Sequence, residues 1–169
     1  MLNSANEALS IQEVTLKNSH LLPEAQQSRI YFVTAMQGQN KQIIFIGFAK
    51  NLRKKISVHK RRMDFEFLDR MGYQINISWM VLPDGMNDKQ ENAVQRFYIR
   101  VFKPKLNYDH NTIATLELEE IRRRNEGWER NQYGYLDKEI EDWQQSGDDQ
   151  ETLIKKIWEA GKERLMLNI

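Results

Sequence analysis

The residues that could do chemistry are concentrated between positions 45 and 62, where a glycine precedes a dense run of basic side chains. Phe45–Phe48 is apolar apart from Gly47, where the backbone can turn sharply because glycine tolerates positive φ. Asn51 stands where a helix N-cap belongs, and seven Lys and Arg residues fall between Lys50 and Arg62. A strand, a glycine turn and a basic helix would gather backbone N–H groups and cations at one place. The stretch therefore predicts a phosphate-binding surface, although such a charge run also suits a solvated helix face.

Lys55 and His59 add to this prediction because they lie four residues apart. In one continuous helix, residues at this spacing project from the same face. A cation and an imidazole on one face could both contact a phosphate, whereas an isolated histidine is usually incidental. We therefore expect Lys55 and His59 to lie together on one electropositive surface.

The surrounding pattern predicts the elements that must position these side chains. Ile30–Ala35 and Gln42–Phe48 are rich in β-branched and aromatic residues, and Gln37–Asn40 between them has the composition of a hairpin turn. The other expected elements are a loose helix over 7–17, a helix over 51–71 with a break near Met63, a strand over 74–82, a helix over 88–102, and helices over about 114–126, 135–145 and 150–166. The predicted fold class is α/β (α+β), a three-stranded antiparallel sheet flanked by helices with an added C-terminal helical extension.

The whole chain has the composition of a globular protein, with 169 residues, 40% of them hydrophobic and 29% charged. It has no cysteine, which excludes disulfides and thiolate chemistry. Residues 1–116 carry 16 Lys and Arg against 10 Asp and Glu, whereas residues 117–169 carry 9 against 14. The basic part can attract a polyanion. Because we find no apolar run of membrane-spanning length and no signal-peptide pattern, we expect a cytoplasmic protein without a membrane partner.

Two short motifs and their context resemble the GIY-YIG nuclease superfamily. Arg29–Tyr31 is similar to the first tripeptide of that family and Phe45–Gly47 to the second. Ala49–Ile56 is similar to the family's helix start, in which a small residue, Lys, Asn and Leu precede basic residues. The order of hairpin, helix, third strand and helix, ending in Pro104–Asn107, also agrees with the family's arrangement.

The resemblance implies cleavage of DNA phosphodiesters, with DNA as the partner and Mg²⁺ or Mn²⁺ as the cofactor if the domain is active. It implies that Tyr31 activates or positions the attacking water, and that Lys55, with His59 beside it, stabilises charge on the phosphate. With this resemblance and the spacing of Lys55 and His59, we expect these three side chains to converge on one concave, electropositive surface. The implied phosphate- or nucleic-acid-binding residues are Lys50, Arg53, Lys54 and Asn107.

Three residues depart from the family pattern, and one departure concerns the metal. Arg29 replaces the first glycine, Phe45 replaces the second tyrosine, and Gln95 stands where the metal-binding glutamate belongs, nine residues before Pro104. A glutamine offers a carbonyl oxygen without charge, and Mg²⁺ is held far better by a carboxylate. Glu91, one helical turn earlier, is either a substitute ligand or a solvent-facing residue. We therefore expect the cleavage activity to be reduced or lost.

The resemblance covers residues 29–107 and leaves 1–28 as an N-terminal helical extension and 108–169 as a C-terminal one. The C-terminal extension is expected to pack on the domain or on a partner subunit, which would give a homodimer. Three functions stay open: a DNA-binding domain of this superfamily with little or no endonuclease activity, an active divalent-metal-dependent DNA endonuclease (a hydrolase), and a protein-interaction scaffold.

Overall fold

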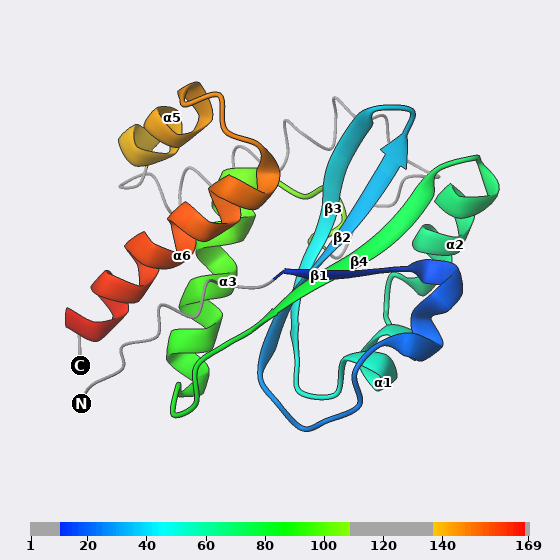
Figure 1. Ribbon diagram of the computed structural model, residues 1–169, viewed down its shortest axis with the longest axis horizontal. Helices are drawn as coiled ribbons and strands as arrows, with labels where there is room; N and C mark the ends of the chain where they lie inside the picture. The colour runs from blue at the N-terminus through cyan, green and yellow to red at the C-terminus, as the bar shows by residue number, and fades with distance from the viewer. Residues whose placement is uncertain (1–10, 109–136, 168–169) are drawn as a thin grey trace.

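The protein has a mixed α and β fold, and the computed structural model describes residues 11–108 and 137–167 (Figure 1). The strands are β1 (Gln12–Thr15), β2 (Arg29–Gln37), β3 (Asn40–Ala49) and β4 (Gln74–Val81). The helices are the 3-10 helix η1 (Leu16–Leu21), α1 (Leu52–Ser57), α2 (Arg62–Arg70), α3 (Asp88–Phe102), α5 (Asp137–Gln145) and α6 (Gln150–Leu167). Within the part of the chain that the structure describes, no helix is long and apolar enough to cross a membrane.

One antiparallel sheet, in the strand order β1-β4-β2-β3, forms the centre of the molecule. β2 and β3 make the predicted hairpin, and Gly38 in its turn has a φ of 61°, which glycine adopts without steric cost. Tyr31 lies opposite Gly47 of β3 on one side and opposite Trp79 of β4 on the other. The three predicted strands are thus confirmed in one sheet, with Tyr31 on an inner strand.

The fourth strand, β1, corrects the expectation of a helix over residues 7–17. Gln12–Thr15 pairs with β4, with Val14 opposite Ile77, and the 3-10 helix η1 begins only at Leu16. The backbone N–H and C=O groups along the edge of β4 need hydrogen-bond partners. The hydrogen bonds that β1 makes with this edge are more favourable than a helix that only a loose spacing of apolar residues would support. The described part of the N-terminal extension therefore adds to the sheet.

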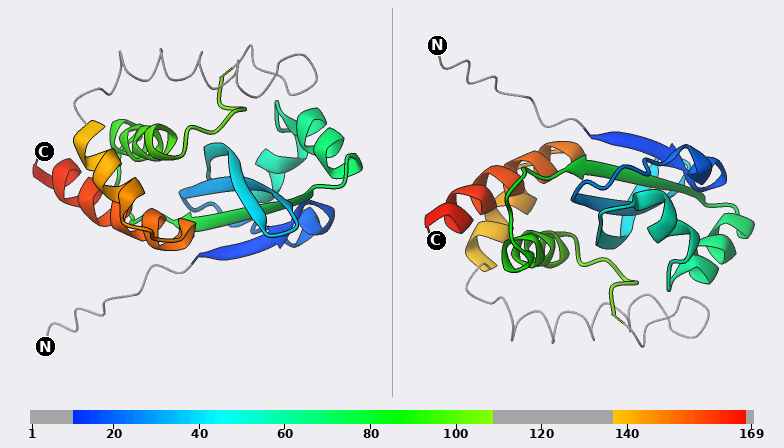
Figure 2. Two further views of the ribbon diagram at one scale, coloured as in Figure 1. Left: turned by 90° about the horizontal axis from the view of Figure 1, so that it is seen from above. Right: turned by 90° about the horizontal axis from the view of Figure 1, so that it is seen from below.

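The sheet separates two groups of buried side chains. Because side chains alternate along a strand, β2 places Tyr31, Val33 and Ala35 in one cluster and Ile30 and Phe32 in the other. We call the cluster that contains Tyr31 the first core; η1, α1 and α2 contribute to it. The second core includes residues of α3 and α6. Figures 1 and 2 show α3, α5 and α6 at one end of the molecule and η1, α1 and α2 at the other.

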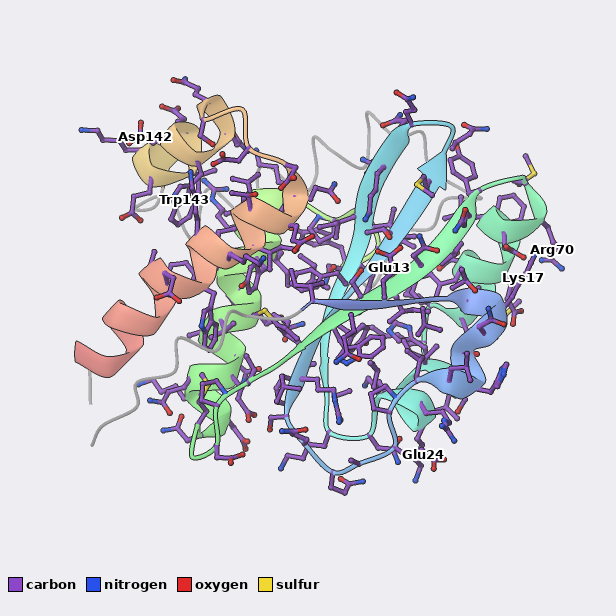
Figure 3. The ribbon with its side chains drawn as sticks, viewed as in Figure 1. Glu13, Lys17, Glu24, Arg70, Asp142 and Trp143 are labelled. Carbon is purple, nitrogen blue, oxygen red and sulfur yellow. The ribbon has the colours of Figure 1, made fainter. Side chains whose placement is uncertain are left out.

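The described part of the C-terminal extension packs on the domain, as one of the two sequence-based alternatives proposed. The Tyr98 hydroxyl donates a hydrogen bond to the Ile154 carbonyl at 2.8 Å, which joins α3 to α6. Ile157 and Trp158 of α6 are buried in the second core, and side chains fill the space between α6 and α3 (Figure 3). The helix expected over 114–126 lies outside the described residues, and a homodimer stays a prediction.

The helix expected over 51–71 is divided into α1 and α2. Asn51 caps α1 as predicted, because its side-chain oxygen accepts the Lys54 backbone N–H at 3.0 Å. The interruption covers residues 58–61, where the backbone N–H of Arg61 donates to Nδ1 of His59 at 2.9 Å. This local bond takes the place of a helical one, so His59 lies in the connection between the two helices.

Candidate functional site

Gly47 lies within β3 and has no positive φ, which corrects the expectation of a sharp turn there. The Tyr31 ring occupies the space beside it, because a Cβ added at Gly47 would lie 2.3 Å from both Cζ and Oη of Tyr31. Directly opposed residues of an antiparallel pair project on the same face of the sheet. The glycine is therefore required for the close approach of an aromatic ring.

Tyr31 and His59 form a buried hydrogen-bonded pair. The Tyr31 hydroxyl lies 2.8 Å from Nε2 of His59, and the two residues are 0% and 6% exposed. Nδ1 of His59 accepts the Arg61 N–H, so it carries no proton in the neutral imidazole. The proton is then on Nε2, and the hydrogen-bond network assigns Nε2–H as the donor and the Tyr31 oxygen as the acceptor.

Aromatic side chains surround this pair and keep it neutral. The His59 ring centroid lies 4.6 Å from that of Phe45 and 5.0 Å from that of Phe65. Burial, together with the nearby cations Lys55, Lys60, Arg61 and Arg62, lowers the pKa of His59 to about 4, and burial is the larger cause. Burial also raises the pKa of the Tyr31 hydroxyl well above its ordinary value. At neutral pH the site therefore contains an uncharged phenol and an uncharged imidazole.

Lys55 does not share a helix face with His59, because α1 ends at Ser57. Its side chain is exposed, whereas Tyr31 and His59 are buried, so these three residues do not line one concave surface. The expectation from the i, i+4 spacing is wrong for that reason. Lys55 is still close enough to lower the pKa of His59, which places the buried pair beneath the basic surface.

Two arginines of the basic run form ion pairs, and four of its lysines are exposed. Arg53 pairs with Glu24 at 2.9 Å, and Arg62 pairs with Glu66 at 2.9 Å. Arg53, an expected phosphate ligand, is half-buried and held by this pair. The exposed lysines, which we call the lysine cluster, are Lys50, Lys54, Lys55 and Lys60.

Asn107 and Gln95 hold the outer edge of β3. Asn107 accepts the Ile46 N–H through Oδ1 at 2.8 Å and donates to the Ile46 carbonyl through Nδ2 at 2.7 Å. Nε2 of Gln95 donates to the same carbonyl at 3.1 Å. Both amides thus complete the hydrogen bonding of an edge strand. This gives a structural role to Asn107, expected at the phosphate, and to Gln95, expected near a metal.

Glu91 is buried, which corrects its interpretation as a solvent-facing residue. It is 6% exposed, and its Oε1 accepts a hydrogen bond from the Ser28 hydroxyl at 2.9 Å. Val94, one helical turn further along α3, packs in the second core, whereas Tyr31 packs in the first. Glu91 and Tyr31 therefore approach the sheet from different faces. Among the described residues, no three His, Cys, Asp or Glu side chains are grouped so that they could hold a metal ion.

Two buried arginines organise this region, and the sequence pattern did not predict their structural roles. Arg29 is 3% exposed, and its Nη1 donates to three carbonyl groups, those of Ala25 at 2.8 Å, Gln27 at 3.1 Å and Lys50 at 2.9 Å. Arg61 is 5% exposed, and its Nε donates to the Leu106 carbonyl at 3.0 Å. A signal existed for Arg29, because an arginine at the start of an apolar strand needs partners when it is buried. Arg61 could not be distinguished from the other members of the basic run.

Comparison of the chain with protein-family models, with curated proteins and with solved structures found no match. The candidate site is therefore defined by its geometry. That geometry consists of a buried, neutral pair of Tyr31 and His59 beneath the exposed lysine cluster.

Proposed function

We propose that this chain is a divergent GIY-YIG-type domain that binds DNA and whose endonuclease activity is reduced or lost. The lysine cluster is the observation that carries the proposal, because its four side chains are exposed in and next to α1. Exposed ammonium groups can neutralise backbone phosphates, and the release of condensed counterions drives binding of this kind. Because the net charge of the whole chain is only +1, this local excess of basic residues also localises that binding.

The side chains expected to perform cleavage form hydrogen bonds to other parts of the protein, and this supports a loss of endonuclease activity. The Tyr31 oxygen accepts a hydrogen bond from Nε2 of His59 in a buried pair, so it is not placed beside an incoming phosphate. The Glu91 carboxylate is bonded to Ser28 on the other face of the sheet, and the Gln95 amide is bonded to β3. A divalent cation that activates water needs charged oxygen ligands near the nucleophile, and these three side chains do not provide them together.

The salt dependence of DNA binding tests the first part of the proposal. Fluorescence anisotropy with a labelled duplex gives the binding constant at several salt concentrations. Replacing Lys55 by glutamine should lower the slope of log K against log salt by about 0.9, and weaken binding about five-fold at roughly 0.15 M salt, if one phosphate contact is lost. The double variant of Lys54→Gln and Lys55→Gln should lower the slope by about twice that amount.

Lys89 provides a matched control, because it is an exposed lysine on α3, away from the lysine cluster. Lys89→Gln has the same change of charge and should leave the slope unchanged. Equal effects of Lys55→Gln and Lys89→Gln would mean that binding is diffuse and would contradict the assigned surface. No binding at low salt would favour the interaction scaffold instead.

Nicking of a supercoiled plasmid with Mg²⁺ or Mn²⁺ tests the second part. We expect no metal-dependent nicking by the unmodified protein above that of Glu91→Gln and Tyr31→Phe. Both variants keep the shape of the side chain, so they separate chemistry from folding. Robust nicking that Glu91→Gln abolishes while DNA binding persists would establish an active endonuclease and overturn this part.

A further inference from the structure

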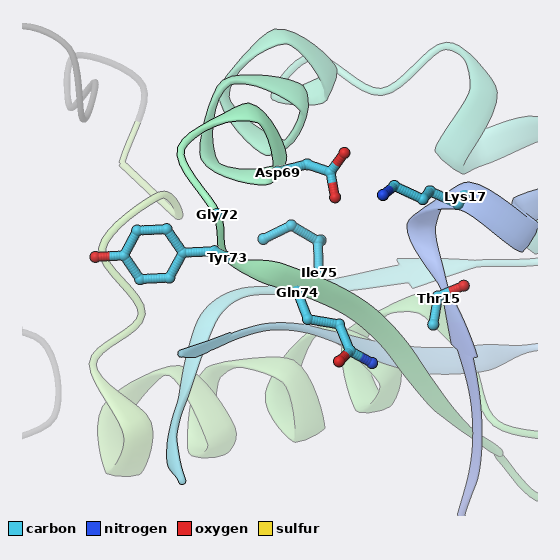
Figure 4. A pocket seen from close by; sticks show the side chains of 7 residues that line it. All are labelled: Thr15, Lys17, Asp69, Gly72, Tyr73, Gln74 and Ile75. Atoms are coloured by element: carbon cyan, nitrogen blue, oxygen red, sulfur yellow. The ribbon is translucent and has the colours of Figure 1, made fainter. Parts of the chain in front are cut away.

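A cavity of ≈ 380 Å³ lies between η1, the end of α2 and the start of β4, where it is separate from the lysine cluster (Figure 4). Its lining residues are Thr15, Lys17, Asp69, Gly72, Tyr73, Gln74 and Ile75. Lys17 and Arg70 are both labelled at this end of the molecule in Figure 3. The volume is within the range of about 300–1,000 Å³ that is typical of small-molecule sites.

Two opposite charges face each other across the cavity. Figure 4 shows the Lys17 ammonium and the Asp69 carboxylate pointing toward one another from η1 and α2. Among the residues that the structure describes, neither side chain forms an ion pair or a hydrogen bond. A cation and a carboxylate are thus both available to a ligand between them.

Two further side chains offer hydrogen bonds to such a ligand. Nε2 of Gln74 donates to Oδ1 of Asn76 at 3.2 Å, which leaves the Gln74 side-chain oxygen as an acceptor. Thr15 contributes a hydroxyl, which can donate or accept. The polar groups therefore include donors and acceptors on different walls of the cavity.

The backbone keeps the walls of the cavity in place. After α2 the chain turns at Gly72, whose φ of 95° favours glycine, and the Gly72 N–H donates to the Asp69 carbonyl at 3.2 Å. The Tyr73 N–H donates to the Leu68 carbonyl at 3.1 Å. Ile75 is 1% exposed and belongs to the first core, so it anchors the start of β4. The cavity is therefore a preformed feature of the fold.

We propose that this cavity binds a small zwitterion of the amino-acid class, with the ligand carboxylate on Lys17 and the ligand ammonium on Asp69. A simple anion would be repelled by Asp69 and a simple cation by Lys17, whereas a zwitterion neutralises both walls. Charge-assisted hydrogen bonds at both ends would orient it. The proposal does not depend on DNA binding, because none of the lining residues belongs to the lysine cluster.

Isothermal titration calorimetry with glycine, L-alanine and L-leucine tests the proposal on the full chain. Propionate and ethylamine serve as ligands that each lack one of the two charges. We expect saturable binding of at least one of the amino acids, and at least about ten-fold weaker binding of the two singly charged compounds. No saturable binding of any amino acid, or equally strong binding of a singly charged compound, would overturn the proposal.

Variants then assign the two charges to their side chains. Lys17→Gln and Asp69→Asn should each weaken binding at least about ten-fold, because one charged contact is lost. Lys89→Gln and Asp84→Asn make the same changes at exposed positions away from the cavity and should have no effect. Binding that is unchanged in both cavity variants would refute the site, and circular dichroism shows whether each variant is folded.

Discussion

Gly47→Ala tests whether the glycine of β3 is required by the Tyr31 ring. The added Cβ would lie 2.3 Å from Cζ and Oη and 2.7 Å from Cε1 of that ring. These distances are far shorter than the optimum of about 3.5–4.0 Å between carbon atoms. The ring is fully buried and lies with its centroid 6.1 Å from Phe45 and 6.0 Å from His59, so it cannot move aside without disturbing the buried pair.

The sign of the change in unfolding free energy separates two explanations of Gly47. If the residue only occupied an ordinary strand conformation, alanine would stabilise the protein by about 0.4–1 kcal/mol, because it restricts the unfolded chain. Overpacking a buried site costs about 1–3 kcal/mol, and leaving the His59 donor without its acceptor costs about 1–3 kcal/mol more. After subtraction of that gain, we therefore expect Gly47→Ala to lower the free energy of unfolding by about 1–6 kcal/mol.

Urea denaturation followed by circular dichroism measures this change, and a double-mutant cycle locates its cause. In a Tyr31→Val background the ring is absent, so Gly47→Ala should cost at least about 1 kcal/mol less than in the unmodified protein. In a Tyr31→Phe background the cost should persist, because Cζ and Cε1 remain. An alanine variant as stable as the unmodified protein, or a cost that Tyr31→Val does not reduce, would refute the reasoning.

Two further predictions concern the buried polar groups. Because the pKa of His59 is lowered to about 4 in the folded state, the unfolded chain, with a pKa of about 6.5, binds a proton first as the pH falls. The stabilising contribution of neutral His59 is therefore present above about pH 6.5 and is lost toward pH 4, so the thermal midpoint should fall across this window. His59→Gln should flatten that fall and His20→Gln, at an exposed histidine, should not; an unchanged profile in His59→Gln would contradict the assignment. Asn107→Ala removes two hydrogen bonds to Ile46 and should cost about 1–3 kcal/mol in urea unfolding, more than Gln95→Ala, which removes one; the reverse order would contradict the edge-strand role.

The sequence was sufficient for the features that depend on neighbouring residues. The hairpin around Gly38 and the strand over 74–82 follow from turn chemistry and from β-branched and aromatic runs. Asn51 caps α1 for the same kind of reason, since its side chain reaches a backbone N–H three residues away. Such interactions are decided by a few consecutive residues, and each was predicted correctly.

Predictions from a weak local sequence pattern were wrong where a segment distant in the sequence supplied better hydrogen-bond or packing partners. Residues 7–17 have only a loose helical spacing, and the edge of β4 draws Gln12–Thr15 into the sheet. Gly47 could be recognised as important but not for the right reason, because the ring that requires it comes from position 31 on the neighbouring strand. Pairing between strands thus decided both outcomes.

The composition of the candidate site was decided by the tertiary structure. The sequence placed Tyr31, Lys55 and His59 in one site, but only the ending of α1 at Ser57 shows that His59 turns inward to Tyr31 while Lys55 stays in solvent. In the same way, the face of α3 that meets the sheet determines that Glu91 is buried against Ser28. Burial and hydrogen-bond partners set the charge state of a side chain, and both arise from residues far apart in the chain. The sequence therefore determines which chemical groups are present, whereas packing determines which of them are neutral, which are paired and which are exposed to a ligand.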